Sequence, residues 1–133
     1  MQAYYGLIID KNGPDHNGTT PLELAAAYGH LGICKEIIKY LTNKNPWNNF
    51  GNPPLHWAAG HGHLEVCKLI MNEISEKSPR NNVGQTPLHF AAKNCHLEVC
   101  RWITNNITAK NPRANDGQTP YDLINMEIKQ IFK

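Results

Sequence analysis

The chain has 133 residues, 41 % apolar and 18 % charged, which is typical of one soluble globular domain. Its net charge of +2 is too small to indicate a nucleic-acid or membrane partner. Apolar runs such as Leu7-Ile8-Ile9 fall far short of the roughly 20 residues of a membrane span. The opening "MQAYYGLIID" also lacks the features of a secretory signal.

The first predicted element lies in residues 1–10. Tyr4, Leu7 and Ile8 have the i, i+3, i+4 spacing of a helical face. We expect half of a second helix here, within a partial N-terminal unit at residues 1–17.

The first complete unit is expected at residues 18–50. Thr20 precedes Pro21, and this pair predicts a helix start, because threonine is a good N-cap and proline suits the first helical position. A short helix with Ala25-Ala26 follows, and alanines let a neighbouring helix approach closely. A Gly-His turn then leads into a longer amphipathic helix. The polar stretch "WNNFG" is expected to form a projecting turn.

The same unit recurs with a period of 33 residues, which is the spacing that separates Pro21, Pro54, Pro87 and Pro120. Units are therefore expected at residues 51–83 and 84–116, with a shortened one at 117–133. One helix pair has no second layer for its apolar face, and stacking supplies it. The pattern predicts a single solenoid domain over residues 1–133.

The repeated phrases "TPLELAAAYGH", "PPLHWAAGHGH" and "TPLHFAAKNCH" resemble the ankyrin-repeat signature over nearly the whole chain. The resemblance implies an all-α solenoid of stacked helix-turn-helix units with projecting turn or hairpin fingers. It also implies a non-catalytic module that binds a partner protein or peptide. The alternatives are a scaffold segment of a longer array with no partner of its own, and an enzymatic or metal site.

Three departures from the family pattern carry further expectations. Pro53 replaces the threonine that pairs with the family histidine, so His56 should lack this partner, whereas Thr86 and His89 keep the pair. Cys95 replaces a turn glycine, at a cost of about 1 kcal/mol if φ is positive there. Apolar residues replace the glycine that usually ends the second helix, so we expect that helix to run about a turn longer. These residues are Leu41, Ile74 and Ile107.

The cysteines and histidines are expected to be structural. Cys34, Cys67 and Cys100 are 33 residues apart, and stacked helices at about 8–10 Å are too distant for a disulfide. Free thiols indicate a reducing, intracellular compartment, the cytoplasm or alternatively the nucleus. His56, His61 and His63 lack the paired spacing of a zinc site. We expect no catalytic residue, cofactor or metal.

Aromatic and basic residues divide between core and surface. Trp57 occupies the register of Leu24 and Phe90, so we expect it in the core. The sequence does not assign Trp102 to either the core or the surface. Trp47 aligns with arginines at the base of a finger and is expected at the surface. A periodic row of lysines is either a solvated face or a contact for an acidic partner. This row comprises Lys11, Lys44, Lys77 and Lys110.

In the family, partners usually meet the finger tips and the outer residues of the first helices. These positions vary here while the surrounding frame does not, which indicates a surface; each of them could equally be plain solvent-facing. We expect a monomer, with no nucleic acid or membrane partner. The candidate binding residues are Tyr28, Trp47, Asn49, Phe50, Asn52, His61, Arg80, Asn82, Val83, Gln85, Lys93, Asn94, Arg113, Asp116 and Gln118.

Overall fold

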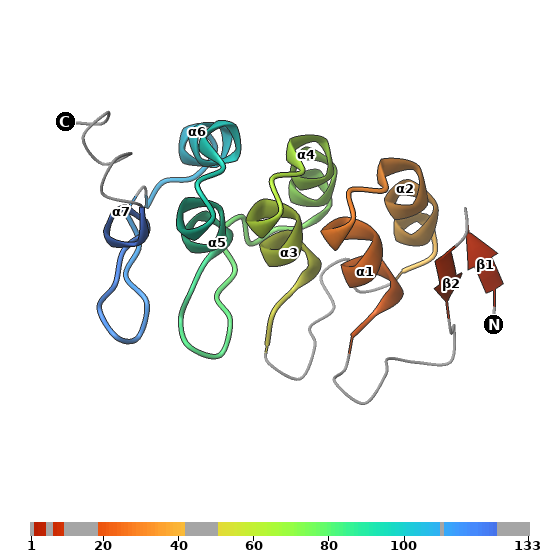
Figure 1. Ribbon diagram of the computed structural model, residues 1–133, viewed down its shortest axis with the longest axis horizontal. Coiled ribbons are helices and arrows are strands. Elements are labelled where there is room, and N and C mark those ends of the chain that lie inside the picture. The colour runs from red at the N-terminus through yellow and green to blue at the C-terminus, as the bar shows by residue number, and fades with distance from the viewer. Residues whose placement is uncertain (1, 5–6, 10–18, 42–50, 110, 125–133) are drawn as a thin grey trace.

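Helix pairs stack along one axis in the computed structural model, which describes residues 2–4, 7–9, 19–41, 51–109 and 111–124 (Figure 1). Each of three pairs joins a short helix to a longer one through a Gly-His or Cys-His turn. The pairs are α1 (Pro21–Ala27) with α2 (Leu31–Lys39), α3 (Pro54–Gly60) with α4 (Leu64–Glu73), and α5 (Pro87–Lys93) with α6 (Leu97–Asn105). The single-turn helix α7 (Pro120–Leu123) continues the row.

The helices form two layers. α1, α3, α5 and α7 lie in one row, and α2, α4 and α6 lie in the second (Figure 1). The described parts of the loops from α4 to α5 and from α6 to α7 project from the first row, on the side away from the second (Figure 1). The predicted helical solenoid with projecting turns is therefore confirmed.

The N-terminal prediction was wrong. Residues Gln2–Tyr4 form β1 and Leu7–Ile9 form β2, and the two pair antiparallel with Gln2 opposite Ile9. The predicted helix rested on only three apolar positions. β-Branched and aromatic residues favour strands, and Gly6 between the two segments weakens a helix.

Side-chain caps begin the short helices wherever threonine precedes the proline. Thr20 Oγ1 accepts from the Glu23 N–H at 3.1 Å. Thr119 and Asp122 bond reciprocally, side chain to backbone, at 3.1 and 3.2 Å. Pro53 provides no such cap to α3. The predicted starts of the short helices are confirmed, although α3 begins without a side-chain cap.

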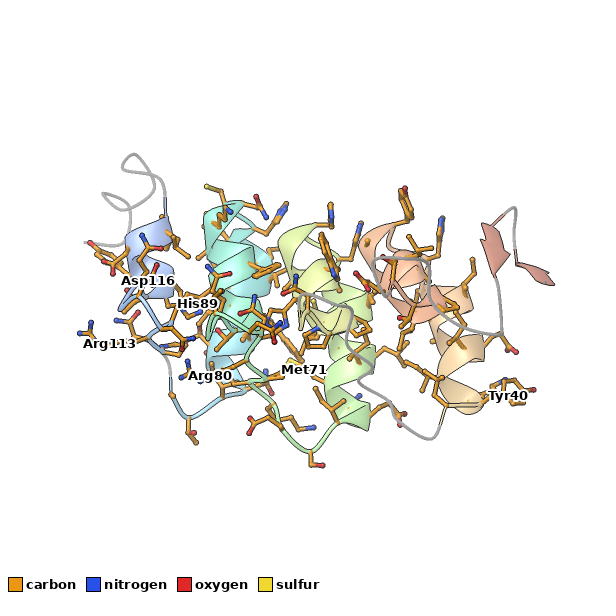
Figure 2. All side chains as sticks on the ribbon, turned by 90° about the horizontal axis from the view of Figure 1, so that it is seen from below. Tyr40, Met71, Arg80, His89, Arg113 and Asp116 are labelled. Atoms are coloured by element: carbon orange, nitrogen blue, oxygen red, sulfur yellow. The ribbon has the colours of Figure 1, made fainter. Side chains whose placement is uncertain are left out.

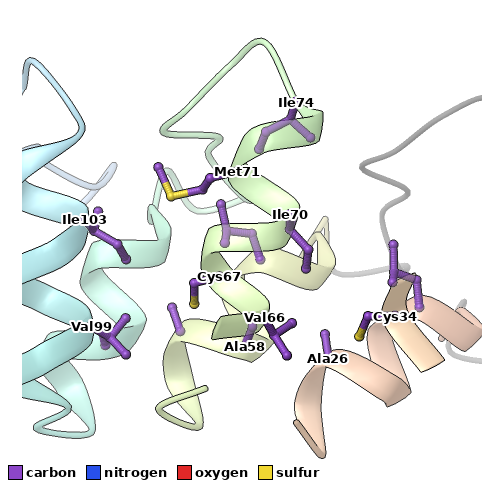
Figure 3. Packing of buried hydrophobic residues seen from close by; sticks show 14 of the residues in the cluster. Ala26, Cys34, Ala58, Val66, Cys67, Ile70, Met71, Ile74, Val99 and Ile103 are labelled. Atoms are coloured by element: carbon purple, nitrogen blue, oxygen red, sulfur yellow. The ribbon is translucent and has the colours of Figure 1, made fainter. Parts of the chain in front are cut away.

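The core lies between the layers and continues from one pair to the next. Alanines at the centre of the short helices, such as Ala58 and Ala59, are fully buried, so neighbouring helices approach closely. Figure 3 shows side chains of α4, among them Cys67 and Ile70, packed between neighbouring pairs. Cys34, Cys67 and Cys100 are free thiols, as predicted, and Cys95 is free as well. Burial raises the pKa of Cys34 to about 11 and of Cys67 to about 12.

The longer helices end earlier than predicted. α4 stops at Glu73, and Ile74 has extended backbone at φ −116° and ψ 147°. The Lys77 ammonium donates to the carbonyl oxygens of Met71 and of Ile74, the latter at 2.6 Å. A lysine can satisfy C-terminal carbonyls and complement the helix dipole, so no extra turn is needed. Lys77 thus caps a helix, while Lys11, Lys44 and Lys110 lie outside the described residues.

The fingers are tight turns closed by backbone hydrogen bonds. The Gly84 N–H donates to the Asn81 oxygen at 3.0 Å, and the Asn81 N–H donates to the Gln85 oxygen at 2.9 Å. The same two bonds recur one unit later, from Gly117 to Ala114 and from Ala114 to Gln118. These backbone hydrogen bonds therefore hold the turns that carry the residues at the finger tips.

Candidate partner-binding face

Histidines join neighbouring units through backbone carbonyls. His63 Nε2 donates to the Ala27 oxygen at 3.0 Å. His56 Nε2 donates to the Gln85 oxygen at 2.7 Å, and His89 Nε2 to the Gln118 oxygen at 2.9 Å. Each bond spans the boundary between one unit and an adjacent unit. The predicted structural role of these three histidines is confirmed.

The two buried histidines differ at Nδ1. His89 Nδ1 accepts from the Thr86 N–H at 3.0 Å and lies 2.9 Å from Thr86 Oγ1. His56 Nδ1 is buried, and no residue that the structure describes bonds to it. Burial lowers the pKa of His56 to about 4, so the ring is neutral at pH 7. The expected loss of a partner at Pro53 is confirmed.

The described residues show no arrangement for metal chemistry or for spanning a membrane. Within the described ranges, no three His, Cys, Asp or Glu side chains are grouped so that they could hold a metal ion. None of the described helices is both long and apolar enough to cross a bilayer. Cys95 has the expected positive φ, at 63°. Burial raises the pKa of Cys100 to about 11, so it is not an activated thiolate.

We define the inner face as the exposed side of the first-row helices together with the projecting fingers. Tyr28, at the end of α1, is 64 % exposed. His61 and Lys93 occupy the corresponding ends of α3 and α5 and are also exposed. The structure therefore brings the predicted helix-end residues onto one face. Of the other candidates, Trp47, Asn49 and Phe50 lie outside the described residues.

The arginines at the finger bases bond to the fingers themselves. Arg80 donates from Nη1 to the oxygen of Gly84 at 2.8 Å and to that of Arg113, one unit away, at 2.6 Å. Arg113 Nη1 donates to the Gly117 oxygen at 3.2 Å. Figure 2 shows Arg80, Arg113 and Asp116 at the same end of the stack. Both arginines therefore stabilise the fingers through these hydrogen bonds, apart from any contact with a partner.

The finger tips combine exposed side chains with contacts to the next finger. Val83 is 54 % exposed, yet its carbonyl accepts from the Asn115 N–H at 2.9 Å. Asn82 lies over Gly51, where an added Cβ would be 2.2 Å from Asn82 Oδ1. Asp116 Oδ1 accepts from the Gln118 N–H at 2.9 Å, and both of these residues are exposed. The side chains at the tips thus project from fingers whose backbones are hydrogen-bonded to each other.

A pocket of about 330 Å³ opens between α3 and α5 on the inner face. We call it the α3–α5 pocket. Five of its residues were predicted from the sequence, namely Asn52, His61, Gln85, Lys93 and Asn94. Gly60 belongs to the helix-end pair Gly60-His61, whose position was expected on the binding side, whereas Trp57 and Phe90 were not predicted as binding residues.

The expectation that Trp57 belongs to the core was wrong. It is only partly buried, its ring stacks on His61 with centroids 6.1 Å apart, and it meets Phe90 edge-on at 6.3 Å. Its register is adjacent in sequence to the buried alanines, and both Trp57 and Phe90 line the α3–α5 pocket. Leu24 and Phe90, in the same register, are also partly buried. The variation in side-chain size at this register, from leucine to tryptophan, was the sequence feature that could have indicated a partly exposed position.

The α3–α5 pocket combines apolar walls with a polar rim. Trp57 and Phe90 form the walls, while Asn94 Nδ2 donates to the Gly60 oxygen at 2.9 Å and closes the end of α3. Lys93 brings a formal positive charge, and none of the described lining residues is acidic. The arrangement can hold an apolar group next to an anionic one.

A second, more apolar hollow of about 450 Å³ lies beside α7. Leu88, Leu97 and Cys100 line it from α5 and α6, and Tyr121 and Ile124 line it from the C-terminal side. It occupies the side of the α5–α6 pair that faces away from α3. None of the candidate binding residues lines it.

Comparison with known families identifies this architecture. The family described as ankyrin repeats (3 copies) matches residues 4–79 and 35–116, which together cover most of the chain. No curated protein matches the sequence.

Proposed function

Because the chain belongs to the ankyrin-repeat family, whose members generally bind other proteins, we propose that it is a non-catalytic interaction module for one partner protein or peptide. The inner face is the proposed binding surface. The whole of residues 1–133 acts as one unit in this proposal, and it works as a monomer.

The observation that carries the proposal is the row of exposed Tyr28, His61 and Lys93 along the inner face, of which His61 and Lys93 line a pocket walled by Trp57 and Phe90. Aromatic residues are enriched among the residues that dominate binding energies. Bonds between units hold this surface in place before any partner arrives. A preformed surface loses little conformational entropy on binding, so more of the contact energy appears as affinity.

The proposed partner is acidic where it meets α5. Lys93 is exposed at the pocket, and the described residues that line the pocket include no carboxylate. Opposite charge steers the encounter and disfavours cationic competitors. The proposed contact set is the fifteen candidates of the sequence analysis together with Trp57 and Phe90.

The test compares two exposed tyrosines on opposite layers. Proteins captured by the intact module are identified, and their affinities are measured for Tyr28→Ala and Tyr40→Ala. Tyr28 lies on the inner face, whereas Tyr40, 82 % exposed, ends α2 in the other row. We expect Tyr28→Ala, combined with His61→Ala, to weaken binding about tenfold or more, because such anchors contribute more than about 1 kcal/mol each. Tyr40→Ala should leave affinity unchanged, and equal effects would refute the assignment.

A second candidate is a segment of a longer array. The apolar hollow beside α7 is the observation that favours it, because a further helix pair could bury that surface by stacking. Fusion of one additional repeat after residue 133 would then raise the unfolding temperature. No change would leave the single-module proposal as the better one.

A further inference from the structure

The depth of the α3–α5 pocket depends on a glycine that the other units lack. Gly60 is the last residue of α3, and the equivalent positions 33 residues away hold Ala27 and Lys93. An added Cβ would lie 3.3 Å from Phe90 Cδ2 and 3.4 Å from Asn94 Nδ2. Gly60 is not among the glycines with positive φ, so the backbone there accepts an ordinary residue. An added Cβ would already crowd these two atoms, so glycine lets Phe90 and Asn94 pack directly against α3, and a larger residue at position 60 would displace them or extend into the pocket.

The walls of this space suit a large apolar group. Trp57 and Phe90 meet edge-on at 84°, and His56 also meets the Phe90 ring edge-on, with centroids 4.9 Å apart. His61 stacks on Trp57 from the rim. Aromatic rings prefer such tilted contacts, and an entering ring or branched aliphatic chain would add to them. The volume is at the lower end of the range of about 300–1,000 Å³ for ligand pockets, which fits one side chain better than a cofactor.

The rim favours a carboxylate beside that apolar group. Lys93, one turn from Phe90 along α5, is exposed at the pocket, and no described lining residue is acidic. On the finger side, Gln85 brings an amide group that suits a peptide backbone, while Asn52 Oδ1 accepts from Asn81 Nδ2 at 2.8 Å and holds the edge of the pocket in place. Charge and shape together thus favour an extended acidic peptide over a basic one.

Building on the function proposed above, we propose that the α3–α5 pocket receives one large apolar side chain of an extended peptide segment. The carboxylate of a neighbouring peptide residue pairs with Lys93. Gly60 is the residue that sets the size of the side chain that the pocket accepts. The partner is thereby narrowed to proteins that carry an exposed segment with a large apolar residue close to Asp or Glu.

The experiment uses a random twelve-residue peptide library displayed on phage, selected against the intact chain. We expect the enriched sequences to share Leu, Ile, Phe or Trp within two or three positions of Asp or Glu. One enriched peptide is then synthesised with a fluorescent label, and its affinity is measured for the wild type and for three variants. These are Gly60→Leu, Lys93→Glu and Gly32→Leu.

Gly32→Leu is the matched control, because Gly32 is exposed on α2 in the other layer and an added Cβ would meet nothing within 4 Å. Gly60→Leu should weaken peptide binding at least about tenfold, while Gly32→Leu binds like the wild type. Gly60→Ala serves as a milder variant should Gly60→Leu fold poorly. Lys93→Glu should lose the acidic peptide and gain affinity for the same peptide with Lys in place of Asp or Glu.

The outcomes separate this inference from the function on which it rests. Peptides that still bind Gly60→Leu and Lys93→Glu but are lost with Tyr28→Ala would overturn the pocket assignment and leave the inner face intact. Peptides insensitive to all these changes would overturn both. Failure to enrich any peptide would overturn the pocket as a peptide site. Binding of a single-stranded oligothymidine that Gly60→Leu abolishes would assign the pocket to a nucleobase instead.

Discussion

The imidazole of His63 lies directly against Gly29 of the preceding unit, so that an added Cβ on Gly29 would be 2.5 Å from His63 Nδ1. The same glycine has a φ of +72°, where L-residues are strained. Two independent constraints therefore act at one position. Gly62 and His96 repeat the relationship one unit later, with the closest approach at 2.6 Å.

Alanine substitutions at two glycines can separate these constraints. Gly117 has a φ of +87°, but an added Cβ there would meet nothing within 4 Å. We expect Gly117→Ala to cost about 1 kcal/mol, from backbone strain alone. Gly29→Ala should cost at least about 2 kcal/mol, because the ring must also move and its bond to Ala27 is lost. Urea unfolding measures both, and equal costs would contradict the steric contact.

Replacing Cys95 should stabilise the protein. Cys95 is a non-glycine residue at positive φ, so Cys95→Gly is expected to raise the free energy of unfolding by about 1 kcal/mol. Cys95→Ala keeps the strain and serves as the control, with little or no gain expected. Chemical denaturation of the two variants decides the matter. A gain in the alanine variant as large as that in the glycine variant would show that the thiol itself is unfavourable.

Restoring threonine at position 53 should stabilise α3. Pro53 has φ −73° and ψ 164°, which threonine adopts readily. Thr at this position offers Nδ1 of His56 both a hydroxyl and an N–H, as Thr86 does for His89. We expect Pro53→Thr to stabilise by about 1 kcal/mol, after losing some proline rigidity. Thr86→Ala is the converse and should destabilise by about 1–2 kcal/mol; the proposed pairing is wrong if the two changes have the same sign.

Stability should fall with pH below neutrality because of His56. Its pKa is about 4 when folded and about 6.5 when unfolded, so the unfolded state binds more protons between these values. This stabilisation is complete above pH 6.5 and is lost as the pH falls towards 4. The loss is about 2 kcal/mol by pH 5. Urea midpoints at pH 7.5 and pH 5 test this.

His56→Gln is the variant that isolates this effect. We expect it to remove about half or more of the pH dependence, the rest coming from His89, whose pKa burial also lowers. An unchanged slope in His56→Gln would place the titrating group elsewhere.

The two finger arginines should differ in their contribution to stability. Arg80 bonds two carbonyl oxygens, one of them in the next unit, whereas Arg113 bonds one at the longer distance of 3.2 Å. Arg80→Ala is expected to cost about 1–2 kcal/mol, and Arg113→Ala less than about 0.5 kcal/mol. Thermal unfolding followed by circular dichroism compares them. If binding falls for Arg80→Ala only in proportion to folded protein, its role is structural.

Periodicity made the frame predictable, because the prolines, alanines and histidines act through contacts that recur every 33 residues. The orphaned Nδ1 of His56 and the strained backbone of Cys95 followed from single departures from that pattern. The ends of the long helices could not be predicted from the repeat pattern. Lys77 caps α4 from six residues beyond Met71, and no local sequence pattern indicates such a bond. The two N-terminal strands were missed because each has only three residues, too few to distinguish a helical period from a strand period.

The composition of the inner face was predictable only in part. Exposed helix ends such as His61 and Lys93 vary between units, and this variation revealed them. The α3–α5 pocket was not foreseen, because it results from an absence at Gly60 combined with two rings that come from different units. Trp57 looked like core since its register holds apolar residues throughout. A pocket between repeats depends on pairs of positions, whereas alignment of the repeats compares one position at a time.

Within the described residues, several bonds between units end on main-chain oxygens, among them those of Ala27, Gly60, Val83, Gln85, Arg113 and Gln118. A carbonyl is the same whatever side chain its residue carries. The side chains at these positions can therefore be substituted while the hydrogen bonds between units remain. Natural drift or a designer's library could retarget such a scaffold to new ligands through a few substitutions, while its architecture stays unaltered.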